Sequence, residues 1–487
     1  MFTPSLIIIF AFSIVMPFIK FIVSTHKIHL ACNILSIIGF SSALIIFSLD
    51  ILEKIRLVLQ NILPSSNPYG IISAFDSSEI LIFLVANSLG LLTSIYSLKY
   101  MERDSGLPIY YSLLFLNVAG ILGLASSYDF FTLFVFWELM CVSSYMLVAF
   151  RKSESESIEA GIKYTIMSSA GSATILFGLT LIYTVTGTLN FQGVASALKA
   201  ISFNPLIYVA LVFLLVGFGI KTALFPLHTW LPDAYMAAPS SISAFMSGIV
   251  TVTGLYAMIR SFSVLSYAVD IHSIWLISVL SVLNMFFGNI AALLQDDLKR
   301  MLAYSSIAHV GYMLIGVSVW TLPGITASLL HLFNHAFIKC VSFFCAGAFV
   351  YRLGTRKLAE MHGVGRVMPL TTSALIISLL SSIGMPPLNG FISKLYLFLA
   401  SMNSGMLWLG LSLVINSAIS AGYYLRIIRV LMAPKSENME KMKEAPIQIV
   451  VPIYAATVFI IFFGLYPDPV FSLAQSAASH ILSLGEG

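Results

Sequence analysis

The chain has 487 residues, of which 59% are hydrophobic and only 9% are charged, and its mean hydropathy is +0.96. Soluble domains carry about 25% charged residues, so this composition excludes a soluble protein and predicts an all-α, polytopic membrane protein. The formal net charge of +4 is no sign of a nucleic-acid partner, because basic residues in such a chain serve to set its orientation.

About fourteen segments are long and apolar enough to cross a bilayer as helices, since one crossing takes about 20 residues. In chain order they cover residues 3–24, 28–52, 78–98, 109–126, 128–150, 158–186, 204–225, 239–262, 272–294, 301–320, 323–351, 370–401, 404–432 and 446–466. The first segment lacks a basic flank and a small-residue cleavage site, so we expect it to be retained as a membrane span.

The basic residues are distributed unevenly over the loops between these segments. If both termini lie outside, the outer loops contain only four of the 25 Lys and Arg residues, namely Lys54, Arg56, Lys199 and Arg260. Cytoplasmic loops are the ones that carry an excess of Lys and Arg. The sequence therefore predicts that both termini lie on the outer side of the membrane. The inner run QDDLKR at 295–300 is expected to be a solvated loop.

Two of the predicted helices contain prolines close to a lysine. In the stretch around 204–235, Lys221 lies five residues before Pro226, and the segment 370–401 contains Pro386 and Pro387 followed by Lys394. Proline inside a helix removes a hydrogen bond and breaks or kinks the helix. Broken helices at corresponding positions in two halves are typical of inverted repeats with ion sites near the bilayer midplane.

This pattern predicts how the chain is divided. We expect N-terminal helices 1–3 in residues 1–105, followed by a first five-helix repeat (helices 4–8) in 106–265 and a second (helices 9–13) in 266–435. An offset of five helices places the two repeats in opposite orientations. Helix 14 and a tail would fill residues 436–487.

Charged residues also occur inside the apolar segments. They are Glu138, Lys163, Lys221, Lys339 and Lys394. A charge at the centre of a membrane helix costs roughly 2.5–3.5 kcal/mol, and such residues usually mark ion or proton pathways. We therefore expect the protein to move ions or protons across the membrane.

Glu138 and Lys221 are the first candidate pair of this pathway. Burial disfavours the charged form of each group, whereas close pairing favours both charges. A pair that closes and opens would therefore switch its affinity for a proton. A static ion pair that joins two helices is the alternative.

The eleventh predicted helix contains His331, His335 and Lys339 at positions i, i+4 and i+8. This spacing stacks the three side chains on one helix face over about 12 Å. Histidines that titrate near neutral pH, followed by a lysine, are suited to a proton wire. Two histidines at this spacing can also bind zinc, but no carboxylate follows on that face. Core histidines with purely structural contacts remain the alternative.

Three further residues complete the candidate set. Lys394 follows the second proline break and would be the terminal site, exchanging with the outer face. Lys163 begins the sixth predicted helix and belongs to a secondary pathway, unless it extends to the inner surface. His309 either links the two halves or fills a core position.

No cofactor or metal is expected in this chain. Its four cysteines form no CxxC pair, and it has neither a P-loop nor the glycine pattern of a dinucleotide-binding fold. The energy for ion movement would therefore come from a redox partner chain or from an existing ion gradient. A carrier for an organic solute would have a polar pocket at the midplane, whereas this sequence has a linear series of charges.

Six segments of the chain carry a family resemblance. They are SYDFFTLFVFWELMCVSSYMLV, EAGIKYTIMSSAGSA, KTALFPLHTWLPDAYMAAPSSISA, DLKRMLAYSSIAHVGYMLIG, HLFNHAFIKCVSFFCAG and PPLNGFISKLYLF. The chain resembles the antiporter-like subunits of respiratory complex I, and is equally similar to the large subunits of Mrp-type Na+/H+ antiporters and of membrane-bound hydrogenases.

The resemblance implies fourteen helices, two inverted repeats and a hydrophilic axis across the membrane centre. It makes Glu138 and Lys221 the pair at which ions enter, the histidines and lysine of the eleventh helix the connecting path, and Lys394 the exit. It also implies partners: other membrane subunits, homologous antiporter-like subunits among them, and Fe–S or hydrogenase-like subunits. The function it implies is ion translocation, of protons or by Na+/H+ exchange, within a redox-driven or antiporter complex of the cell membrane. The chain would then be the translocation subunit of a multi-subunit oxidoreductase.

One departure from the family pattern concerns the eighth predicted helix. Many members have a lysine there and some have a histidine, whereas this chain has Met246 and Val252 at the positions that we assign to them. The path from Lys221 to the second half then lacks a titratable group. A structural spacer that does not conduct ions is therefore the alternative function.

Overall fold

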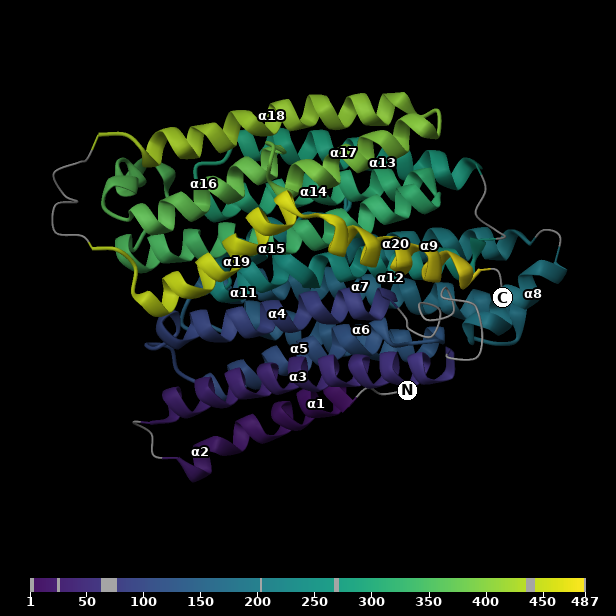
Figure 1. The fold of residues 1–487 in the computed structure, drawn as a ribbon, viewed down its shortest axis with the longest axis horizontal. Helices are drawn as coiled ribbons and strands as arrows, with labels where there is room; N and C mark the ends of the chain where they lie inside the picture. The colour runs from purple at the N-terminus through teal and green to yellow at the C-terminus, as the bar shows by residue number, and fades with distance from the viewer. Residues whose placement is uncertain are drawn as a thin grey trace.

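The structure is a computed structural model that describes residues 4–23, 27–62, 77–201, 204–266, 271–434 and 443–485. Within these ranges the chain is helical, with two isolated β-bridges and no extended strand. The long helices run side by side along the longest axis of the molecule (Figure 1). Twelve helices, or thirteen if one bent pair is taken as a single span, are long and apolar enough to cross a membrane.

Each of the fourteen predicted segments has a helical counterpart. The unbroken helices of the first half are α1 Pro4–Val15 with α2 Ile19–Ile22, α3 Ile28–Ile62, α4 Ser77–Tyr100, α5 Leu107–Ala125, α6 Phe130–Val148, α7 Ser155–Thr186, and α11 Ser240–Phe245 with α12 Thr251–Val264. Those of the second half are α13 Ile271–Leu293, α14 Leu298–Val319, α15 Leu322–Leu353, α18 Leu407–Leu431 and α19 Ile447–Leu465.

Both predicted helix breaks are present. The first separates α9 Pro205–Lys221 from the short helix α10 Trp230–Ala237, and Lys221 is the last residue of α9. The second separates α16 Pro369–Ile383 from α17 Asn389–Asn403, and Lys394 lies in α17, after the break.

Three helices were not predicted. They are α10, α8 Phe191–Ala200 and α20 Asp468–Ser483. The last of these lies in the residues predicted to form helix 14 and a tail, and it packs against α15 and α4. Its buried face consists of Val470, Ala474, Ala477, Ala478 and Ile481, and the three alanines allow a close approach to its neighbours. Such a face has little hydropathic signal over a window of membrane length.

α15 lies at the centre of the packing. It is buried from Gly324 to Phe349 and contacts α14, α17, α19, α20, α16 and α4. A helix that is enclosed on all sides presents its polar residues to other helices and not to lipid. In Figure 1 the two ends of the chain lie toward the same end of the bundle.

Candidate functional site

Lys221 is held by hydroxyl groups. Its side chain is buried, and its ammonium donates hydrogen bonds to the hydroxyls of Ser144 at 2.9 Å and Tyr164 at 2.5 Å. These two hydroxyls lie 3.0 Å apart, so the three groups form a closed triangle. The ammonium also lies 4.9 Å from the centre of the Tyr164 ring, which adds a cation–π contact. Because Ser144 is on α6 and Tyr164 on α7, the lysine at the end of α9 joins three helices.

The predicted ion pair between Glu138 and Lys221 is not closed in this structure. No ion pair joins these two residues, both of which lie in the described ranges. Glu138 and Ser144 are six residues apart on α6, which corresponds to about 9 Å along the helix axis. The carboxylate oxygen Oε1 of Glu138 is buried and has no hydrogen-bond partner in the described structure. The carboxylate and the lysine are therefore separated, with the lysine held by the hydroxyls.

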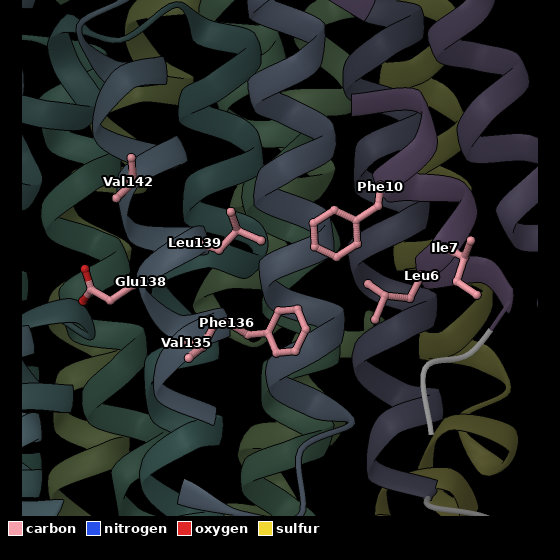
Figure 2. Close-up of a pocket in the computed structure, with 8 residues that line it drawn as sticks. All are labelled: Leu6, Ile7, Phe10, Val135, Phe136, Glu138, Leu139 and Val142. Atoms are coloured by element: carbon pink, nitrogen blue, oxygen red, sulfur yellow. The ribbon is translucent and has the colours of Figure 1, made fainter. Parts of the chain in front are cut away.

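Glu138 lies at the edge of an open groove between α1 and α6. The groove has a volume of about 700 Å³, and its lining is otherwise apolar, including Leu6, Phe10 and Leu139. Figure 2 shows Leu139 and Phe136 pointing toward the side chains of α1, while the Glu138 carboxylate points away from them. The carboxylate is therefore directed to the other side of α6 from α1.

The polar row on α15 is assembled as the spacing predicts. His331, His335 and Lys339 are all buried. His309 of α14 joins them, because its Nδ1 lies 3.0 Å from Nε2 of His331 and the two rings stack. The His335 ring centre lies 5.2 Å from that of His309, and neither of its nitrogens has a hydrogen-bond partner in the described structure. The Lys339 ammonium donates to the Ser305 hydroxyl at 2.5 Å.

Lys394 is held at the second helix break. Its ammonium donates to the carbonyls of Ser382 at 2.8 Å and Ile383 at 3.1 Å, and to the Ser417 hydroxyl at 3.0 Å. The two carbonyls are at the C-terminus of α16, where the helix dipole favours a positive charge. The ring of Tyr312 lies beneath the ammonium, with its centre 4.4 Å away.

The histidines connect to the helix that contains Lys394. Nδ1 of His331 lies 2.8 Å from the hydroxyl of Ser393, the residue next to Lys394. Tyr312 packs edge-on against the rings of both His309 and His331. Hydrogen-bonding groups and an aromatic ring therefore fill the space between the histidines and the last lysine.

Hydroxyl groups line the helix between Lys221 and the second half. α11, the π-helical turn Met246–Val250 and α12 form one fully buried span, Ser240–Val264. The Ser247 hydroxyl lies 2.9 Å from that of Ser306, the neighbour of the serine that binds Lys339. The Thr251 hydroxyl is hydrogen-bonded to the Tyr235 hydroxyl of α10. Met246 and Val252 are buried and offer no titratable group.

Lys163 does not belong to the buried row. Its side chain is 48% exposed and forms ion pairs with Glu159 at 2.8 Å and Asp233 at 2.9 Å.

Lys299, by contrast, was predicted to lie in a solvated loop, and this prediction is wrong. It is buried at the start of α14, and its ammonium donates to the carbonyl of Ala238 at 2.6 Å. The described residues contain no group of three His, Cys, Asp or Glu side chains that could hold a metal ion.

Comparison with known sequences decides the family. The transmembrane family of the NADH:quinone oxidoreductases and Mrp antiporters matches residues 127–420. The chain belongs to this family. Subunit N of the F(420)H(2) dehydrogenase of Methanosarcina mazei is 32% identical to this antiporter-like chain, over 81% of the chain and 82% of the relative. Subunit N of the NADH-quinone oxidoreductase of Desulforudis audaxviator is 34% identical, over 83% and 84%.

Solved structures resemble the antiporter-like chain over nearly its whole length. A chain of the membrane-bound sulfane sulfur reductase, an archaeal respiratory membrane complex, superposes with a TM-score of 0.86 at 29% identity, covering 99% of this chain and 98% of that one. A chain of respiratory complex I from Thermus thermophilus superposes with a TM-score of 0.74 at 26% sequence identity, covering 97% of this chain and 99% of that one. A chain of the Mrp complex of Dietzia superposes with a TM-score of 0.79 at 23% sequence identity, covering 97% of both chains, and shows that the two share a fold. This chain is thus an antiporter-like, multi-pass membrane subunit, and its relatives are subunits of multi-subunit membrane complexes.

Proposed function

We propose that this subunit translocates ions, as protons or by Na+/H+ exchange, along its buried polar row. The observation that carries the proposal is the hydrogen-bonded series in the second half, from His309 through His331 to Ser393, which ends beside Lys394. Buried ionisable groups in a membrane protein are expensive and usually functional. Imidazole nitrogens can both accept and donate a proton near neutral pH, so adjacent rings can pass one along.

At the other end of the row, Glu138 and Lys221 form the switch at which ions enter. The arrangement described above is its open position, with Lys221 on the hydroxyls and Oε1 of Glu138 without a hydrogen-bond partner among the described residues. In the closed position the two charges would meet and stabilise each other. A change of charge in a neighbouring subunit, near the side of α6 to which the Glu138 carboxylate points, would bias the switch.

The relatives support the assignment of this subunit to a larger complex. Partners that contain redox centres would make the complex redox-driven, and partners without them would make it a gradient-driven antiporter. We also propose two inverted repeats, in residues 106–265 and 266–435, which the two helix breaks support. The excess of Lys and Arg in the predicted inner loops supports an outer location for both termini, and the two chain ends lie toward the same end of the bundle (Figure 1).

A structural spacer is the second candidate function, because the helix between Lys221 and Lys339 offers hydroxyls in place of a titratable group. Replacement of Lys394 by alanine separates the two candidates. The complex is purified from its native membrane and reconstituted in vesicles, and ion movement is driven by its own electron donor or by an imposed ion gradient. We expect translocation to fall more than tenfold with assembly intact, because the terminal site is lost.

The exposed Lys357, whose side chain is 75% exposed, provides the matched control. Lys357→Ala should translocate ions like the wild type. If Lys394→Ala also does so, the row does not conduct and the spacer is the better description.

A further inference from the structure

The short helix α10 is in direct contact with the groups that hold Lys221. Its first residue, Trp230, stacks on the ring of Tyr164, with ring centres 4.1 Å apart and planes 7° apart. The indole Nε1 donates to the carbonyl of Ile220 at 2.7 Å, immediately before Lys221. A displacement of α10 would therefore disturb both the tyrosine that binds the lysine and the backbone that carries it.

The position of α10 is fixed by charged contacts from other helices. One turn after Trp230, the carboxylate of Asp233 lies 2.9 Å from the Lys163 ammonium of α7 and 3.4 Å from the Arg300 guanidinium of α14. Helix α10 has only eight residues, and an isolated helix of that length is not stable in water. Its placement therefore depends on such tertiary contacts.

Two more cations contact the C-terminal end of the same helix. Lys299 donates to the carbonyl of Ala238, and Arg356 donates to the carbonyl of Met236 at 3.3 Å. Cations stabilise the negative end of a helix dipole. In these contacts, Asp233 is the charged side chain that α10 itself contributes. Its carboxylate pairs with Lys163 of α7 and with Arg300 of α14.

We propose that Asp233 is a positioning residue for Lys221. Its two ion pairs fix α10, and α10 in turn holds Tyr164 and the end of α9, so that Lys221 stays on the hydroxyls when it is not paired with Glu138. The proposal rests on the function proposed above, in which Lys221 takes part in ion transfer. It gives Lys163 a role as an anchor of α10, outside the conduction path.

The test compares Asp233→Asn with Asp233→Glu and with a matched control, Glu159→Gln. Glu159 also pairs with Lys163, at 2.8 Å, but it lies on α7. Backbone hydrogen exchange of residues 222–238 is measured in the purified complex, together with ion translocation in vesicles. We expect exchange in Asp233→Asn to be about two- to tenfold faster, the range that two partly exposed ion pairs can account for. Translocation should fall several-fold.

Asp233→Glu should restore both readings, and Glu159→Gln should change neither. If Asp233→Asn does not assemble, Lys163→Gln removes one of the same two pairs from the α7 side and should give a smaller acceleration. Faster exchange with unchanged translocation would overturn the proposal, as would a loss of translocation without faster exchange. The function itself is tested separately by Lys394→Ala, so its failure is distinguishable from the failure of this inference.

Discussion

Removal of a single hydroxyl group tests how Lys221 is held. Tyr164→Phe deletes the hydroxyl that accepts a 2.5 Å hydrogen bond from the ammonium. It keeps the ring that stacks on Trp230 and lies beneath the lysine. Volume and packing therefore stay close to those of the wild type, and the perturbation is confined to one hydroxyl, which accepts from Lys221 and is also hydrogen-bonded to the Ser144 hydroxyl.

The size of the effect follows from the charge on the donor. A hydrogen bond to a charged group contributes about 1.5–3 kcal/mol, and every 1.4 kcal/mol changes an equilibrium tenfold. Loss of the Tyr164 hydroxyl should therefore shift the equilibrium between the two positions of Lys221, on the hydroxyls or paired with Glu138, about 10- to 150-fold away from the hydroxyls. If transfer requires Lys221 to alternate between the hydroxyls and Glu138, translocation should fall several-fold while the complex stays assembled.

The assay is ion uptake by the reconstituted complex in vesicles with a pH-sensitive dye. Tyr145→Phe is the matched control, because Tyr145 packs edge-on against Tyr164 and its hydroxyl is not bonded to Lys221 in the described structure. Ser144→Ala, alone and combined with Tyr164→Phe, should give a non-additive loss, since both hydroxyls bind the same ammonium. Equal uptake by the wild type and Tyr164→Phe would refute the reasoning.

Two further predictions concern packing and stability. A Cβ atom at Gly254 would lie 2.9 Å from Thr222 and 3.3 Å from the Cβ of Lys221, so Gly254→Ala should destabilise the subunit by about 1–3 kcal/mol, measured by thermal unfolding of the complex. Arg260→Met should cost about 3 kcal/mol or more in the same measurement, because the buried guanidinium donates to the carbonyls of Leu124 and Ser127. The side chain of Arg426 is 41% exposed, so Arg426→Met should cost less than about 1 kcal/mol. An equal cost for Arg260→Met and Arg426→Met would contradict the argument.

The features predicted from the sequence are those with a local signal. The membrane helices follow from runs of apolar residues, the two breaks from prolines, and the row on α15 from the helical period of His331, His335 and Lys339. The partners of Lys221 could not be predicted in this way, because Ser144 and Tyr164 lie 77 and 57 residues away along the chain. Their types, serine and tyrosine, are too common in such helices to stand out.

The error at Lys299 has a different cause. Neighbouring charges in the run QDDLKR suggested a solvated loop, but Asp297 caps α14 by accepting a hydrogen bond from the backbone N–H of Arg300 at 2.9 Å. The helix therefore begins at Leu298 and carries Lys299 into the interior, beneath the end of α10. Aspartate is a preferred N-cap residue, and taking Asp297 as the N-cap would have moved the predicted helix start by three residues.

The two lysines at the helix breaks are held by different kinds of acceptor. Lys221 is bound by side-chain hydroxyls, which can rotate to accept a hydrogen bond from the ammonium or to donate one to the neutral amine. Lys394 is bound by two backbone carbonyls at the C-terminus of α16, which are fixed and carry partial negative charge.

If Glu138 and Lys221 form the proposed switch, the proton affinity of Lys221 depends on the position of Glu138, whereas the backbone partners of Lys394 are fixed by the fold. In the proposed function, a proton that leaves the first site would then move toward a site whose hydrogen-bond partners do not change with the switch. This difference would give the proposed pathway a direction, because its first lysine is the one whose proton affinity the carboxylate on α6 would control. Disruption of the carbonyls that hold Lys394 would then remove the direction of transfer, whereas disruption of the hydroxyls that hold Lys221 would remove the control of transfer by Glu138.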